Sequence, residues 1–518
     1  LFMAGFDGLE PTAEILDLIQ RQAISGVILF SRNTRDAEQV ATLTRRLQEA
    51  AREAGHRYPL LIAIDQENGV VQRLVGIGTQ FPGAMALGAA GSEELAYAVA
   101  EATGRELRAL GINMNLAPVA DVNNNPANPV IGVRSFGEDP QRVARLVAAT
   151  VRGYRAAGVI SVLKHFPGHG DTAVDSHLAL PIVPHTMERL DAVELPPFKS
   201  GIEAGAESVM IAHVALPQLM SGDELPATVS PEVVTRLLRR RLGFDGAILS
   251  DCMEMDAIVT TIGTERAAVL ALLAGTDLVL ISHTYSRQIG GIQAAREALA
   301  RGELTREMVE RAVERVLRMK AAALRWDERP FAEARAEIAS EAHLRLRDEA
   351  YTRAITVVRN EAGLLPMRLD AGERVLVLGL LPERVTLAVE NLYSQDALVE
   401  GIRQHHANTD GITVASRASE GELAAMWAAI EAADVVVATT LNANLDERQA
   451  ERMRALVGTG KRVVGIAVGA PYDLLAFPAL QTYLATYEFT SPALRTVGQA
   501  LFGAVEAVGR LPVTLVGA

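Results

Sequence analysis

Ionisable side chains and hinge-type residues are concentrated between residues 164 and 177, which read KHFPGHGDTAVDSH. This stretch holds three of the ten histidines and one of only four lysines in the chain. Imidazole and carboxylate groups at this density can transfer protons or bind a metal ion. The stretch is therefore the first candidate for an active site.

Two chemical interpretations of this stretch are open. Five of its side chains could bind zinc or manganese: His165, His169, Asp171, Asp175 and His177. Alternatively, Asp175 and His177 could form a dyad in which the carboxylate orients the imidazole and raises its basicity. The HxxxHxD spacing is not a usual metal signature, and the adjacent Lys164 would repel a divalent cation. We favour the dyad and expect no bound metal.

Further ionisable residues stand at the ends of short apolar segments. LLIAID ends in Asp65, ISVLKH ends in Lys164 and His165, VMIAH ends in His213, and AILSD ends in Asp251. If these segments are strands of a barrel, their carboxyl ends open onto one face, where active sites are built. Asp251 is the candidate nucleophile, because the apolar segment before it would hold the carboxylate rigidly. The next residue, Cys252, should point the other way as a small buried thiol, and we give it no role.

Eight apolar segments, each followed by a helix-length segment, occupy the first 282 residues. They are residues 1–6, 26–30, 60–65, 113–118, 160–165, 209–213, 247–251 and 277–282. Short segments rich in Val, Ile and Leu, separated by amphipathic ones, are typical of a parallel sheet buried on both faces. Eight units predict an α/β fold with a (β/α)8 TIM-type barrel, although a doubly wound open sheet would also satisfy the pattern.

The length of 518 residues indicates two domains, because a single core stops growing at roughly 250–300 residues. We expect the barrel over residues 1–326, with its closing helix at 311–326, and a charged linker over 327–350. A smaller α/β sandwich domain should follow over 351–518, with strands at 354–359, 374–379, 434–438, 462–467 and 482–487. None of these segments matches a nucleotide-binding motif, so no cofactor is expected.

Composition excludes several classes of partner. A net charge of -13 argues against nucleic acid, which is bound by clustered cations. No segment reaches the roughly 18 consecutive apolar residues that a membrane span needs. A single cysteine excludes an internal disulfide and fits the cytoplasm. Because the chain begins with Leu1, removal of a leader and export stay open, as does the oligomeric state.

Four motifs together resemble glycoside hydrolase family 3, specifically its β-N-acetylglucosaminidase branch. They are AIDQENG (63–69), GVRSFGEDP (132–140), KHFPGHGDTAVDSH (164–177) and AILSDCMEM (247–255). The histidine-rich motif with its terminal Asp-Ser-His is the mark of that branch. Residues 354–367 and 468–478 also resemble the second domain of two-domain members, so the resemblance covers essentially the whole chain.

The resemblance implies a retaining exo-β-N-acetylglucosaminidase that removes terminal β-linked GlcNAc from peptidoglycan fragments or chitooligosaccharides. By the same resemblance, Asp251 is the catalytic nucleophile and His177 with Asp175 is the general acid/base dyad. The residues that would hold the sugar hydroxyls are Asp65, Arg134, Lys164 and His165. This chemistry is coherent, since a retaining glycosidase needs a nucleophile and a proton donor on opposite sides of the anomeric carbon.

The chain departs from the branch just after the DQE motif. Members commonly have two glycines there, followed by Arg, whereas this chain has Asn68, Gly69 and Val70. Asparagine tolerates the left-handed backbone conformation, so the turn can persist. The departure bears on the contacts just beyond Asp65 and on the choice of substrate.

Three other functions stay open. A neutral histidine does not repel phosphate, so the glycosyl-enzyme could be resolved by phosphate, as in a β-N-acetylglucosaminide phosphorylase. A metal-dependent barrel hydrolase would use the histidine-rich stretch as ligands. A non-catalytic sugar-binding protein would need neither a rigid Asp251 nor a titratable dyad.

Overall fold

The computed structural model describes residues 1–175, 179–220, 225–326, 329–382 and 394–515. The first domain is built on a closed barrel of eight parallel strands in sequence order. The strands are β1 (Phe2–Ala4), β2 (Gly26–Leu29), β3 (Leu61–Ile64), β4 (Met114–Asn115), β5 (Ile160–Phe166), β6 (Ser208–Ile211), β7 (Ala247–Cys252) and β8 (Leu278–Ile281). Each lies in one of the eight predicted segments or overlaps it. Because β1 pairs with β8, the sheet is closed and the barrel prediction is confirmed over the open sheet.

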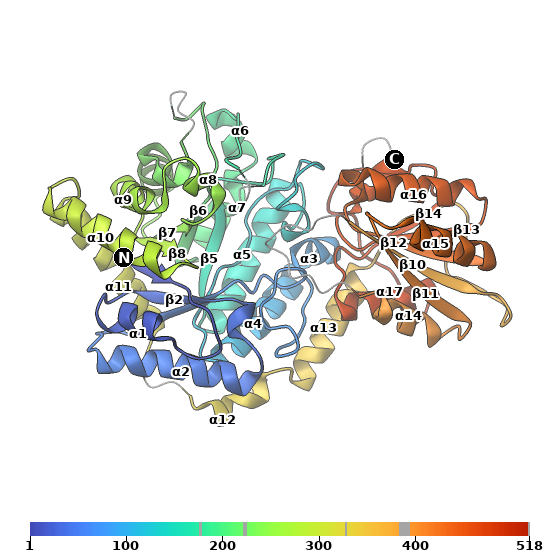
Figure 1. Cartoon of the computed structure of the whole chain (residues 1–518), viewed down its shortest axis with the longest axis horizontal. Helices are drawn as coiled ribbons and strands as arrows, with labels where there is room; N and C mark the ends of the chain where they lie inside the picture. The colour runs from blue at the N-terminus through green and yellow to red at the C-terminus, as the bar shows by residue number, and fades with distance from the viewer. Residues whose placement is uncertain (176–178, 221–224, 327–328, 383–393, 516–518) are drawn as a thin grey trace.

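Helices surround the barrel, as Figure 1 shows. The α-helices are α1 (Ala13–Gln20), α2 (Ala37–Glu53), α3 (Ala84–Ala90), α4 (Glu93–Ala109), α5 (Pro140–Ala156), α6 (Met187–Ala192), α7 (Leu195–Glu203), α8 (Asp256–Val259), α9 (Thr264–Ala274) and α10 (Tyr285–Ala300). A π-helix, η4 (Glu232–Arg241), takes the place of an α-helix between β6 and β7. Start signals in the sequence explain several boundaries. In α5, for example, the Asp139 side chain accepts hydrogen bonds from two backbone amides of the first turn, and Pro140 follows it.

One further helix, α11 (Arg306–Ala323), closes the end of the barrel where the strands begin. Its Val316 and Met319 join the apolar cluster that fills the barrel interior. Arg315 contacts Asp277, the residue before β8, at 3.2 Å. The opposite end of the barrel, where the strands finish, is therefore the end that can hold a site. The predicted closing helix is present, but it begins five residues earlier than expected, after the N-cap Thr305.

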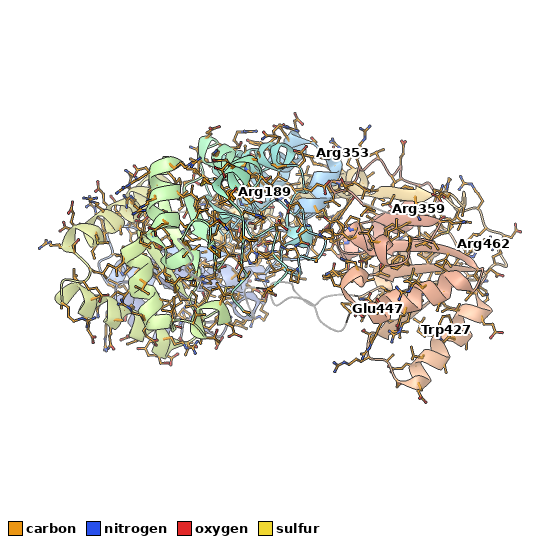
Figure 2. The ribbon with its side chains drawn as sticks, turned by 90° about the horizontal axis from the view of Figure 1, so that it is seen from above. Arg189, Arg353, Arg359, Trp427, Glu447 and Arg462 are labelled. Atoms are coloured by element: carbon orange, nitrogen blue, oxygen red, sulfur yellow. The ribbon has the colours of Figure 1, made fainter. Side chains whose placement is uncertain are left out.

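The connection between the domains is helical and is attached to the barrel. It contains α12 (Phe331–Ala334), η5 (Arg335–Glu337) and α13 (Glu341–Ala354). The carboxylate of Glu106 on α4 accepts hydrogen bonds from the Ala339 amide at 3.1 Å and from His343 Nδ1 at 2.8 Å. Figure 2 shows Arg353, near the end of α13, at the junction of the two domains.

The second domain is a six-stranded sheet in the order β11-β10-β12-β13-β14-β9. Its strands are β9 (Thr356–Asn360), β10 (Val375–Leu381), β11 (Thr409–Ala415), β12 (Val435–Thr440), β13 (Arg462–Ala467) and β14 (Thr482–Ala485). Only β9 runs antiparallel to its neighbour. Five of the strands correspond to the five predicted segments. The sequence analysis missed β11, since its TDGITVA sequence is polar and largely exposed, as an edge strand allows.

Helices cover both faces of this second sheet, which confirms the α/β sandwich. They are α14 (Asp396–Arg403), α15 (Glu420–Ala432), α16 (Glu447–Gly458) and α17 (Ser491–Leu501). One apolar cluster packs α15 and α16 on one face, and another packs α14 and α17 on the other. Figure 2 shows Trp427 on α15 and Glu447 on α16, both on the second domain. Among the described residues of both domains, no helix has the length and apolarity to cross a membrane.

Candidate active site

A cavity of about 460 Å³ opens at the carboxyl ends of the barrel strands. Its wall includes five of the seven residues proposed from the sequence: Asp65, Arg134, Lys164, His165 and Asp251. The volume is in the usual range for sites that bind small molecules. Residues up to 186 positions apart in the chain are thus brought to one place, as expected for strand ends of one barrel.

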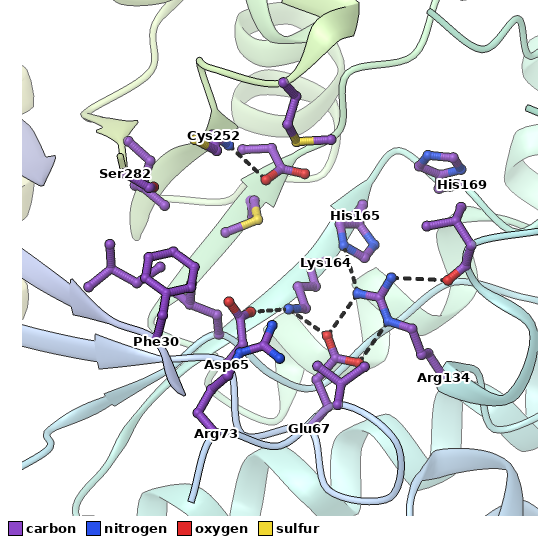
Figure 3. A pocket seen from close by; sticks show the side chains of 18 of the residues that line it. Phe30, Asp65, Glu67, Arg73, Arg134, Lys164, His165, His169, Cys252 and Ser282 are labelled. Carbon is purple, nitrogen blue, oxygen red and sulfur yellow. Dashed lines mark hydrogen bonds and ion pairs between the residues drawn. The ribbon is translucent and has the colours of Figure 1, made fainter. Parts of the chain in front are cut away.

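Buried ion pairs form one wall of the cavity, and Figure 3 shows them as a connected row. Lys164 Nζ lies 2.6 Å from Asp65 Oδ1 and 2.7 Å from Glu67 Oε1. Arg134 donates two parallel hydrogen bonds to Glu67, from Nε at 2.9 Å and from Nη2 at 2.8 Å. We call these four residues the sugar clamp, after the role that the family resemblance implies for three of them. The bidentate geometry fixes the guanidinium plane as well as its position.

The charges of the clamp hold one another ionised. Burial alone would raise the pKa of Glu67, but Arg134 and Lys164 outweigh it and hold that pKa well below its ordinary value. Burial likewise opposes the charge on Lys164, yet Asp65 and Glu67 raise its pKa above the ordinary value. Neither group therefore titrates near neutral pH, and the clamp presents a fixed pattern of charge to a ligand.

His165 is oriented by a carboxylate behind it. Its Nδ1 lies 2.7 Å from Asp121 Oδ2, and its Nε2 lies 3.4 Å from Arg134 Nη2. Because an ionised carboxylate only accepts hydrogen bonds, Nδ1–H donates to Asp121, and Nε2 is the acceptor facing the arginine. Burial would raise the pKa of Asp121, but His165 and His169 lower it. The imidazole of His165 therefore has a defined tautomer.

His169 also lines the cavity but is held differently. Its backbone amide donates to Asp121 Oδ1 at 2.7 Å, and its Nδ1 lies 2.8 Å from Thr172 Oγ1. Burial lowers the pKa of His169 to about 4, and the neighbouring His165 adds to the shift. His169 is thus a neutral, structural histidine at neutral pH. Among the described residues, no three His, Cys, Asp or Glu side chains are grouped as metal ligands would be.

Asp251 lies at the end of β7, in the cavity wall. Its Oδ1 accepts a hydrogen bond from the Cys252 amide at 2.7 Å. The carbonyl of Cys252 in turn accepts from His213 Nε2 at 2.9 Å, so this buried histidine fixes the strand end from behind. Of the strand-end residues singled out in the sequence, His213 is the one that is not among the described residues lining the cavity.

The expectation that Cys252 points away from the site was wrong, because Cys252 also lines the cavity. Alternation along a strand requires regular pairing, and the register of β7 against β8 shifts between Leu249 and Cys252. Burial raises the pKa of the Cys252 thiol to about 11, so it is uncharged at neutral pH.

The proposed proton-transfer dyad is only partly covered by the structure. Asp175 is buried and does not belong to the described residues that line the cavity. Its proposed partner, His177, lies outside the described residues. Asp175 therefore stays a prediction in its catalytic role, as does His177.

The turn after the DQE motif persists, as expected. Asn68 adopts a φ of 70° and Gly69 a φ of 60°, so asparagine does take the left-handed conformation here. The Asn68 side chain donates to Thr103 Oγ1 at 3.0 Å. Val70, at the position where the branch often has Arg, is buried in an apolar cluster with Phe489 of the second domain. The apolar side chain at this position therefore packs against the second domain.

Two residues with clear parts in the site were not singled out from the sequence. Glu67 lies inside the AIDQENG motif, and Asp121 follows the fourth apolar segment by three positions. A search for the countercharges that buried Lys164 and Arg134 require would have pointed to Glu67. Asp121 had no comparable signal, since its contact with His165 depends on how two neighbouring strands end.

The barrel domain and the second domain both match family models. Residues 3–319 match the glycosyl hydrolase family 3 N terminal domain, and residues 355–517 match its C-terminal domain. "Beta-hexosaminidase A" of Pseudoalteromonas piscicida is 33% identical, over 97% of this chain and 91% of that protein.

Solved structures of the same family are also similar. A glycoside hydrolase family 3 β-N-acetylglucosaminidase from Paenibacillus sp. str. FPU-7 superposes with a TM-score of 0.92 at 39% identity, over 99% of this chain and 97% of that one. A fungal multi-domain family 3 β-N-acetylglucosaminidase gives a TM-score of 0.94 at 42% identity, and this chain spans 60% of its length. With both domain models matched and relatives aligned along nearly its whole length, the chain belongs to glycosyl hydrolase family 3.

Proposed function

We propose that this protein is a retaining exo-β-N-acetylglucosaminidase. The observation that carries the proposal is that Asp251 and the sugar clamp line one cavity of a size for a sugar and its leaving group. The names of its relatives, a β-hexosaminidase and two β-N-acetylglucosaminidases, support the choice of sugar. All catalytic groups would lie in the barrel domain, residues 1–326.

In the first step, a carboxylate oxygen of Asp251 attacks the anomeric carbon as the glycosidic bond breaks. His177, oriented by Asp175, gives its proton to the departing oxygen, so the leaving group is released as an alcohol. In the second step, His177 takes a proton from water. The resulting hydroxide adds to the anomeric carbon, and the bond to Asp251 breaks with retention of configuration.

The clamp residues would hold the sugar while this happens. Asp65 can accept hydrogen bonds from hydroxyl groups, while Lys164 and Arg134 can donate them. His165 presents Nε2, because Asp121 occupies Nδ1. Since these groups are already fixed by one another, little reorganisation is needed when the sugar binds or when charge develops on it.

Product analysis tests this proposal and separates it from its alternatives. The protein is incubated with an aryl β-N-acetylglucosaminide, with GlcNAc-anhydroMurNAc and with chitobiose, each with and without phosphate. We expect free GlcNAc whose first-formed anomer is β, at a rate independent of phosphate. The two natural-type substrates show whether peptidoglycan fragments or chitooligosaccharides are preferred.

Each alternative has its own outcome in that assay. GlcNAc 1-phosphate formed in proportion to phosphate would replace the hydrolase with a phosphorylase. Activity lost to a chelator and restored by zinc would indicate a metal-dependent hydrolase. Saturable binding of the sugar without turnover would indicate a sugar-binding protein.

A further inference from the structure

Asn128 connects two chain segments that both contribute residues to the cavity wall. It is buried, with 5% of its surface exposed, in the segment between β4 and α5. Its side-chain Oδ1 accepts hydrogen bonds from the amides of Val130 at 3.0 Å and Ile131 at 2.7 Å. Its Nδ2 donates to the His169 carbonyl at 2.9 Å and to Thr172 Oγ1 at 3.4 Å. One amide group thus bridges two segments that lie about forty residues apart in the chain.

The acceptor half of Asn128 supports the sugar clamp. The turn that it caps brings the Val130 carbonyl to Arg134, whose Nη1 donates to it at 3.1 Å. The Arg134 amide also donates to the Ile131 carbonyl at 2.8 Å. The turn that positions Arg134 beside Glu67 is therefore stabilised by Asn128, which accepts from two of its backbone amides.

The donor half supports the segment that leads to Asp175. His169 is held at its amide by Asp121 at 2.7 Å. At Gly170 a side chain would come within 1.9 Å of the Val122 carbonyl, so the two segments are in direct backbone contact there. Asn128 adds a further bond to this attachment, at Thr172, three residues before Asp175.

We propose that Asn128 is a positioning residue that sets the start of the proton-transfer loop against the sugar clamp. The inference rests on the proposed function, in which Asp175 and His177 supply the proton. Asparagine suits this position because its amide offers two donor and two acceptor sites, and all four are used. Aspartate would keep the acceptors but place a carboxylate oxygen against the His169 carbonyl. An aliphatic residue would lose both the acceptor and the donor hydrogen bonds.

The test separates the two halves with two variants. In Asn128→Asp the clamp half remains, so we expect kcat on poor leaving groups, such as phenyl or a second sugar, to fall about thirtyfold. Turnover of a 2,4-dinitrophenyl glycoside, which needs little proton donation, should fall less than about threefold. The inhibition constant of free GlcNAc should stay unchanged. In Asn128→Ala both halves are lost, so GlcNAc inhibition should also weaken, by about tenfold.

Asn125→Asp is the matched control, because it makes the same change in the same segment. The Asn125 Oδ1 accepts a hydrogen bond from the Ala127 amide at 2.9 Å, and aspartate keeps that bond. This control should behave as wild type. Thr172→Val removes the hydroxyl that accepts from Asn128 and that also contacts His169 Nδ1, so it should reproduce the leaving-group pattern of Asn128→Asp at smaller amplitude, about fivefold.

Two results would overturn the inference. One is an equal loss on good and poor leaving groups in Asn128→Asp, and the other is a loss no larger than in Asn125→Asp. If Asn128→Asp does not fold, the Thr172→Val pattern decides. Wild-type protein is measured first: failure to release GlcNAc from any of these glycosides would refute the proposed function, which is a separate outcome from any difference among variants.

Discussion

The sugar cavity and the interface between the domains both bury carboxylates, but they compensate them in opposite ways. In the cavity, Glu67 lies between two cations and its pKa is held well below the ordinary value. At the interface, the donors to Glu488 are neutral groups among the described residues, including the Gly83 amide at 3.0 Å and Thr490 Oγ1 at 3.3 Å. Burial raises its pKa to about 7.

The difference separates two uses of a buried acid. A site that binds a polar ligand needs charge that does not vary with pH, and buried charge is stable only beside countercharge. A contact between domains needs only a hydrogen bond, which a neutral carboxyl group can make. Glu488 also lies against the turn after the DQE motif, where a side chain on Gly69 would come within 2.4 Å of its Oε2. The two environments are therefore close neighbours, and substitutions can test whether they act separately.

The largest effect is expected for the one cavity carboxylate that would react. Asp251→Ala should lower kcat on a 4-nitrophenyl glycoside at least about ten-thousandfold, because no covalent intermediate can form. Its melting temperature should stay near that of wild type, since the residue ends a strand at the rim. Cys252→Ser is the matched control in the same wall and should retain activity within about threefold. Full activity of Asp251→Ala would remove Asp251 from the mechanism.

The next largest loss of turnover is expected for the proposed proton donor, His177. Since Glu67 and Lys164 do not titrate near neutrality, we expect the proton donor to give one limb of the pH–rate profile, near the ordinary imidazole pKa of about 6.5. His177→Ala should lower kcat on phenyl glycosides by about a thousandfold, but much less on dinitrophenyl glycosides, and should abolish that limb of the pH profile. Equal losses on both substrates would show that His177 is not the donor.

Removing charge from the clamp should have an intermediate effect. Glu67→Gln leaves the buried Arg134 without its paired carboxylate and Lys164 with Asp65 alone, a type of change that costs about 3–5 kcal/mol in stability. We expect GlcNAc inhibition to weaken by about a hundredfold, together with a lower melting temperature. Glu49→Gln, which removes the exposed partner of Arg45, is the matched control and should cost under about 1 kcal/mol. If both variants behave alike, the paired charges of the cavity are not what binds the sugar.

The contrast between these regions also explains what sequence could predict. Strand positions followed from short apolar segments, because every barrel strand is buried on both faces. Asp65, Lys164 and Asp251 followed from their places at strand ends, and Arg134 from a motif. By contrast, Asp121 acts through a contact between neighbouring strand ends, which no local pattern encodes.

The burial of Glu488 at the domain interface could not be predicted from the sequence, for a similar reason. Glu488 is an ordinary glutamate after the last strand of the second domain, and its environment depends on Gly83 of the barrel, 405 residues away. A carboxylate without a nearby cation in sequence gives no sign of burial. Only the packing of one domain on the other makes it an acid with a raised pKa.

The smallest effect on turnover is therefore expected at the interface. The folded pKa of Glu488, about 7, exceeds its ordinary value of 4.5, so the protonated form is favoured by folding. Its contribution to stability is fully present below pH 4.5 and is lost as pH rises through 7. Glu488→Gln stays neutral, so its melting temperature should fall less than that of wild type between pH 5 and pH 8. Turnover should change less than about threefold, because the clamp keeps its own charges.

Asp473, a second buried acid of this domain with a pKa raised to about 7 by burial, retains part of the pH dependence in that variant. Glu488→Gln should therefore reduce the pH dependence of the melting temperature only in part. The double variant Glu488→Gln with Asp473→Asn should reduce it further. The exposed Glu506→Gln serves as control and should leave the wild-type profile intact. A large loss of GlcNAc binding in Glu488→Gln would contradict the separation of the two regions, because it would mean that the interface acid sets the geometry of the clamp through the turn at Gly69.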